Sequence, residues 1–122
     1  MKKVVCFALA LVFLLSACMS PMYKMDDQHK KYAEKAIEIA DAYLDFDLTT
    51  DEAYTKISAL HDAEGTLPSV EEGDELYHGN FMVETEVFLL YCAISDAKFK
   101  RSGSDVLERR NTLAQTIGKS KR

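Results

Sequence analysis

The chain has 122 residues, of which 48% are apolar and 29% charged, a balance typical of folded domains and too apolar for disorder throughout. Its formal charge of -5 at pH 7 is unevenly spread: residues 18–97 carry 18 acidic and 5 basic side chains, whereas residues 98–122 carry 2 acidic and 8 basic side chains. Most of the surface would therefore repel phosphate, which argues against nucleic acid as a partner. The length leaves room for one small domain.

The first 17 residues have the order of a signal peptide, with two lysines after Met1, an unbroken apolar run from Val4 to Leu15, and two small residues. As a helix, this run of 12 residues reaches only about 18 Å, whereas the hydrocarbon core of a membrane is roughly 30 Å thick. We therefore expect residues 1–17 to be removed after export rather than kept as a membrane span.

The four residues Leu15, Ser16, Ala17 and Cys18 resemble the lipobox of bacterial lipoproteins, in which a leucine and two small residues precede a cysteine. The resemblance implies cleavage by signal peptidase II between Ala17 and Cys18, a diacylglyceryl group on the sulfur of Cys18, and fatty acylation, for example with palmitate, of the new amino group. Two or three acyl chains give lasting attachment. The implied location is the extracytoplasmic face of a bacterial membrane, either the cell membrane or the outer membrane. The alternative is an ordinary secreted protein in which this cysteine is a coincidence.

The mature chain is expected to begin with a tether. Residues 18–25 contain Pro21 and no helical periodicity, which favours a lipidated cysteine followed by a flexible segment. A helical domain is predicted for residues 26–118, and the basic tail at 119–122 is expected to fray. This basic end is expected to pair with the acidic body or to stay solvated, and the alternative is contact with anionic lipid head groups.

The first half of the domain predicts a helical hairpin. Apolar residues recur at spacings of three and four from about Asp27 to Phe46, which is typical of one face of an amphipathic helix. A second helix is expected to start after Thr49 and to run to about Glu64. Thr49 and Glu52 have the spacing of a capping box, in which each side chain bonds the backbone N–H of the other.

The second half predicts another hairpin. Residues 65–74 form an expected acidic loop, and a long third helix is expected to begin near Glu75 and to be most buried around residues 87–94. Ser104 is expected to cap a fourth helix that ends before Gly118. No segment is typical of a strand. We therefore predict an all-α fold, a small antiparallel bundle of about four helices arranged as two hairpins.

Glu75 and His78 are weak candidates for metal ligands, because a Glu-x-x-His pair at helical spacing places two ligands on one helix face in di-iron bundles. Such bundles need a second pair, and the nearest partner, Asp26 with His29, lies at the fraying start of a helix. A chance motif is the favoured interpretation, so that no metal and no cofactor are expected.

Two further acidic motifs have plain structural interpretations. The segment from Asp45 to Asp51 alternates oxygen-bearing side chains as a calcium loop does, but Thr50 stands where the turn needs glycine. Lys56 stands where the loop needs its bidentate glutamate, which favours a solvated interhelical turn. His61, beside an aspartate at a helix end, is predicted to be a surface residue.

The sequence contains no pattern typical of a catalytic site. Cys92 is the one cysteine left once Cys6 is removed and Cys18 is lipidated, and its apolar neighbours favour a buried small side chain over a nucleophile. Neither a glycine-flanked serine elbow nor a phosphate-binding glycine loop is present. We therefore expect a non-enzymatic binding or interaction module whose partner is a protein of the cell envelope. The alternative is a carrier of a ligand or metal inside the bundle, and a small hydrolase built on His61 or His78 is less favoured.

Overall fold

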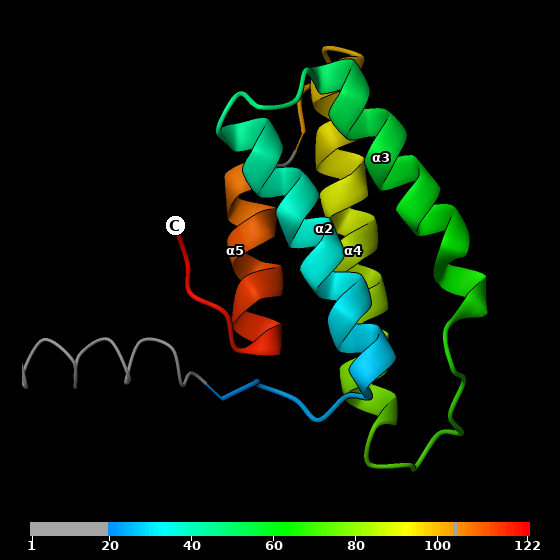
Figure 1. Cartoon of the computed structure of the whole chain (residues 1–122). Coiled ribbons are helices and arrows are strands. Elements are labelled where there is room, and N and C mark those ends of the chain that lie inside the picture. Colours follow the sequence, from blue (N-terminus) through cyan, green and yellow to red (C-terminus); the bar gives the residue numbers. More distant parts are fainter. Residues whose placement is uncertain (1–19, 104) are drawn as a thin grey trace, which may run out of the picture.

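The computed structural model describes residues 20–103 and 105–122. Within these ranges the chain forms four α-helices and one short 3-10 helix, without any strand (Figure 1). The elements are α2 (Asp27–Leu44), α3 (Thr50–Asp62), η1 (Ala63–Thr66), α4 (Tyr77–Lys98) and α5 (Val106–Ile117). The predicted all-α bundle is thereby confirmed. The signal peptide, the lipobox and Ser104 lie outside the described residues.

The four helices are arranged around a central pair. Helices α2 and α4 each pack against the other three helices, and α3 and α5 flank this pair on opposite sides (Figure 1). Consecutive helices run in opposite directions, so that the chain forms two helical hairpins. None of the helices in the described ranges is both long enough and apolar enough to cross a membrane.

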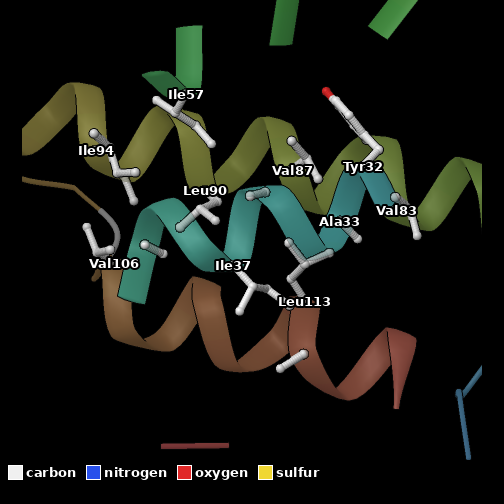
Figure 2. Close-up of a cluster of buried hydrophobic side chains, with 14 of the residues drawn as sticks. Tyr32, Ala33, Ile37, Ile57, Val83, Val87, Leu90, Ile94, Val106 and Leu113 are labelled. Carbon is white, nitrogen blue, oxygen red and sulfur yellow. The ribbon is translucent and has the colours of Figure 1, made fainter. Parts of the chain in front are cut away.

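The core lies where all four helices meet. Each helix contributes at least one fully buried large aliphatic side chain to this cluster, as Figure 2 shows, among them Ile37 of α2, Ile57 of α3, Leu90 of α4 and Leu113 of α5. Burying such a side chain stabilises the fold by roughly 1.5–3 kcal/mol. The apolar spacing seen along the sequence therefore corresponds to the packed faces of the helices.

The helix ends are fixed by local hydrogen bonds. At the start of α3 the predicted capping box is confirmed, since the Glu52 N–H donates to the Thr49 hydroxyl and the Thr49 N–H donates to the Glu52 carboxylate, both at 3.1 Å. At the start of α5 the N-cap is Asp105, one position after the predicted Ser104, which lies outside the described residues. The Asp105 carboxylate accepts the Leu107 N–H at 2.8 Å.

The segment expected to be a flexible tether contacts the helices at residues 22–25. The Met22 N–H donates to the Thr116 carbonyl at 3.1 Å, and the backbone of Lys24 lies so close to α4 that a Cβ on Gly79 would come within 1.9 Å of its carbonyl oxygen. Glycine at position 79 therefore lets this segment lie against α4. The packed body extends beyond the predicted boundary at residue 26, because these contacts join residues more than 50 positions apart.

The basic C-terminal tail was expected to fray, and this expectation is wrong. Arg122 and Asn111 exchange two hydrogen bonds, at 2.9 and 3.2 Å, and the Arg110 guanidinium donates to the Ser120 carbonyl at 2.6 Å. Arg110 also donates to both carboxylate oxygens of Asp41, at 2.8 and 3.1 Å. We call Asp41, Arg110, Asn111 and Arg122 the Arg110 cluster. It fastens the tail and α5 to the C-terminal half of α2.

Candidate functional site

The predicted metal-ligand pair does not form a site. Glu75 precedes the first residue of α4 and pairs with Lys24 at 3.1 Å, whereas the His78 ring packs edge-on against Tyr23 with centroids 4.9 Å apart. The two side chains therefore have different partners outside the bundle interior. In the part of the chain that the structure describes, no group of three or more histidine, cysteine, aspartate or glutamate side chains is placed to hold a metal ion.

His29 is a buried polar residue with a partner at each ring nitrogen. Its side chain is fully buried, and its Nδ1 lies 2.8 Å from Asp26 Oδ2 while its Nε2 lies 2.9 Å from Glu84 Oε1. Asn80 completes the group, since its amide nitrogen donates to Asp26 Oδ2 at 2.9 Å. We call Asp26, His29, Asn80 and Glu84 the His29 cluster. It joins the start of α2 to the first turns of α4.

The geometry of the His29 cluster assigns it a structural role. Both ring nitrogens face a carboxylate oxygen, and both donate only when the imidazole carries two protons. Both ring nitrogens therefore already have partners within the chain, which leaves neither of them free to contact a substrate. Sequence reasoning placed Asp26 and His29 at a fraying helix start, and this is wrong, because the partner residues on α4 lie more than 50 positions away.

Asp26 is also the N-cap of α2, and its pKa reflects both the cap and the contacts within the His29 cluster. Its carboxylate accepts the His29 backbone N–H at 2.7 Å. Burial by itself would raise the pKa of Asp26, but the hydrogen bonds from His29 and Asn80 hold that pKa below its ordinary value. The carboxylate is therefore ionised at neutral pH, as an N-cap next to the positive end of a helix dipole favours.

The outer face of α4 carries a row of exposed aromatic side chains. Tyr77, Phe81 and Phe88 are 37%, 54% and 44% exposed, and Glu84 lies between them in sequence. Spacings of four, three and four residues place all four side chains on one helix face. We call Tyr77, Phe81 and Phe88 the α4 stripe. Phe88 is an exposed exception within residues 87–94, where this helix was expected to be most buried.

A second aromatic group continues this face along the seam between α3 and α4. The His61 ring stacks on Tyr91 with centroids 5.1 Å apart and lies 5.5 Å from the Phe88 ring. Tyr54 packs against Tyr91 at 6.0 Å and against the half-exposed Phe99 at 5.6 Å. His61 is therefore a half-buried member of an aromatic surface rather than an isolated surface residue.

The segment that carries the α4 stripe is acidic. Residues 57–97 include nine aspartates and glutamates and no lysine or arginine. The loop between η1 and α4 contributes the exposed Glu71, Glu72 and Asp74 beside the first turn of α4. Two of the nine acidic residues pair with basic residues from outside the segment, Glu75 with Lys24 and Asp96 with Arg101.

A small pocket lies between this loop and α4. It has a volume of about 140 Å³. We call it the loop pocket, and it is lined by Pro68, Ser69, Val70, Tyr77, Asn80, Phe81 and Glu84. Two residues of the stripe and one carboxylate of the His29 cluster thus meet at one cavity.

Glu64 and Tyr32, which lie near the His29 cluster, both have pKa values raised by nearby negative charge. Burial and the nearby charge of Glu84 raise the pKa of Glu64, in spite of His61 and His29. Burial and the charges of Glu64 and Glu84 also raise the pKa of Tyr32, whose hydroxyl points away from the core (Figure 2) and has no hydrogen-bond partner among the described residues. Negative charge is therefore in excess at this end of the bundle.

Cys92 has the properties expected of a non-nucleophilic thiol. It is half-buried on α4, and burial together with the charge of Asp96 raises the pKa of its thiol. A raised pKa lowers the thiolate fraction at neutral pH, and the thiolate is the reactive form of cysteine.

Sequence reasoning missed both the His29 cluster and the α4 stripe. A spacing of three and four between exposed aromatic residues was visible, but the same spacing is typical of a core face. Comparison with protein-family models, with curated protein sequences and with solved structures finds no significant match to this chain.

Proposed function

We propose that this chain is a membrane-anchored lipoprotein whose helical domain is a non-enzymatic binding module for a protein of the cell envelope, held through the α4 stripe. The observation that carries the proposal is the alignment of three exposed aromatic side chains on one helix face. Large apolar side chains that gather on a surface mark interaction sites, and aromatic residues supply much of the binding energy at protein interfaces. The anchor rests on the lipobox residues Leu15 to Cys18.

The stripe is also placed where a partner can reach it. It lies on the α3 side of α4, since Phe88 contacts the His61 ring of α3, whereas α5 and the docked tail cover the other side of the central pair (Figure 1). A partner that packs on Phe81 and Phe88 would remove apolar surface from water, and each Å² so buried stabilises a complex by about 25 cal/mol.

The two alternatives have less support. A carrier would use the bundle interior, but there the helices are packed through fully buried aliphatic side chains such as Ile37 and Leu90. A hydrolase would need an accessible histidine beside a carboxylate. His29 is fully buried between its two partners. His61 is 29% exposed with its Nε2 4.0 Å from Glu64 Oε2, but its ring is held by stacking on Tyr91.

The anchor is tested by replacing its cysteine. Cys18→Ala should abolish incorporation of labelled palmitate and block cleavage before residue 18, because the thioether can no longer form. Normal processing and labelling of this variant would overturn the lipoprotein assignment.

The binding surface is tested by photo-crosslinking in intact cells. A photoreactive phenylalanine at position 88 should give a discrete crosslinked partner that mass spectrometry identifies, and Phe81→Ser in the same chain should reduce its yield several-fold. The matched control carries the same group at Leu107, which is 37% exposed on α5. Equal crosslinking from positions 88 and 107, or none from position 88, would refute the role of the stripe.

A further inference from the structure

The walls of the loop pocket have the chemistry that recognises a cation. Tyr77 and Phe81 line it with aromatic rings, and Glu84 adds a carboxylate. Aromatic faces attract ammonium and guanidinium groups, and a carboxylate pairs with them directly. With about 140 Å³, the pocket is smaller than the roughly 300–1,000 Å³ of a typical small-molecule site. It is the size for one side chain rather than for a cofactor.

The charge of the pocket is not balanced from within. The His29 cluster sets the two carboxylates of Asp26 and Glu84 against a single imidazole ring, and only Oε1 of Glu84 bonds His29. Glu64 lies close enough for the charge of Glu84 to raise its pKa. The chain supplies no lysine or arginine between residues 57 and 97. A cation that enters from outside would therefore relieve the repulsion between these carboxylates.

We propose that the loop pocket binds an arginine or lysine side chain of a basic segment in the protein partner, while the rest of the α4 stripe packs against apolar residues of the same segment. This inference rests on the proposed function and names the chemistry of the partner. A guanidinium fits best, because it stacks on an aromatic face and donates two parallel hydrogen bonds to a carboxylate. Charge complementarity on this face also speeds association and makes it sensitive to salt.

The test uses two synthetic peptides and the full lipidated chain in nanodiscs of phosphatidylcholine, a lipid without net charge. One rhodamine-labelled peptide alternates leucine with arginine, and the other carries citrulline, the uncharged isostere, in place of each arginine. Fluorescence anisotropy should show at least tenfold tighter binding of the arginine peptide. Equal affinity of the two peptides would overturn the proposal.

Matched variants place the binding in the pocket. Glu84→Gln, which keeps an acceptor for His29, should weaken arginine-peptide binding about tenfold, whereas Glu72→Gln in the exposed loop should change it less than twofold. Phe81→Leu should weaken binding several-fold without touching the His29 cluster, and Phe99→Leu, of similar exposure at 52%, should not. If Glu72→Gln weakens binding as much as Glu84→Gln, the attraction is diffuse and the pocket is not the site.

The outcome separates this inference from the function on which it rests. Partner crosslinking at position 88 that persists while the peptide experiments fail would overturn the pocket and leave the binding module standing. A crosslinked product that contains only this chain would identify a second copy as the occupant and would overturn the assignment to a foreign basic segment.

Discussion

Both ends of α2 are fastened to a neighbouring helix by a buried side chain that lies against carboxylates, but the two side chains, His29 and Arg110, differ in chemistry. At the start of the helix, His29 lies between Asp26 and Glu84 and ties α2 to α4. Near the end of the helix, Asp41 receives the two-pronged guanidinium of Arg110 and ties α2 to α5. Arginine stays charged at every pH at which proteins fold, whereas the imidazole bridge needs two protons on its ring.

The pKa values of Asp26 and Asp41 are lowered by these partners in the same way. Burial would raise the pKa of Asp26 and of Asp41, but hydrogen bonds from His29 and from Arg110 with Arg122 hold both below 3.8. Carboxyls with depressed folded-state pKa values add stability above pH 3.8 that is lost as the pH falls through those lower values. The clusters therefore differ in what removing the central side chain leaves behind. Without the His29 ring, Asp26 keeps only hydrogen bonds from neutral donors, namely Asn80 and the backbone N–H of residue 29, whereas without Arg110, Asp41 keeps the charged Arg122.

The largest effect is expected at the His29 cluster. His29→Leu keeps the volume and removes both ring nitrogens, so that Asp26 and Glu84 face each other across a buried apolar side chain. Breaking a buried ion pair from one side is strongly destabilising, and we expect the free energy of unfolding to fall by roughly 3 kcal/mol in urea denaturation. The control is His78→Leu at an exposed ring, with little change. A loss no greater than that of the control would show that the imidazole does not hold the helices together.

A smaller effect is expected at the Arg110 cluster. Arg110→Met should lower the free energy of unfolding by about 2 kcal/mol, because Asp41 still pairs with Arg122 and part of the charge stays compensated. The Ser120 carbonyl loses its donor as well, so that trypsin should cleave after Lys119 several-fold faster than in the unchanged protein. Lys35→Met on the exposed side of α2 provides the control. Unchanged cleavage in Arg110→Met would show that the tail is held by other contacts.

The smallest effect is expected at Glu86, a buried carboxyl that bonds neither His29 nor Arg110. It is 6% exposed on α4, its Oε2 has no hydrogen-bond partner among the described residues, and burial raises its pKa above 4.5 in spite of a hydrogen bond from Thr116. A raised folded-state pKa means that ionisation opposes folding, so stability falls as the pH rises through that value.

Glu86→Gln stays neutral at every pH and tests this directly. The variant should match the unchanged protein at pH 4 and exceed it by roughly 1 kcal/mol at pH 8, which is the lower end of the penalty for an unsatisfied buried group. Thermal unfolding at the two pH values measures the difference, with Glu38→Gln on the exposed face of α2 as the control. A pH-independent difference would mean that the pKa of Glu86 is the same in the folded and the unfolded protein.

The local parts of this structure were predictable. Four helices follow from apolar residues at spacings of three and four, and the Thr49 capping box involves residues three positions apart. Such features depend on neighbours within one or two helical turns, so the sequence holds all their determinants. The errors at helix ends were small for the same reason. Asp105 rather than Ser104 caps α5, and the predicted second helix ends in the η1 turn.

The His29 cluster and the Arg110 cluster were not predictable, because their residues lie far apart in the sequence. His29 meets Glu84 across 55 positions and Arg110 meets Asp41 across 69, and nothing local distinguishes these residues from other charges in an acidic chain. The α4 stripe was hidden for a related reason. Aromatic and aliphatic residues surround α4 near residues 87–94, and only the position of α3 decides that Leu90 is covered while Phe88 remains 44% exposed. Helix formation is a property of neighbouring residues, whereas burial and pairing are decided by which helices come to lie side by side.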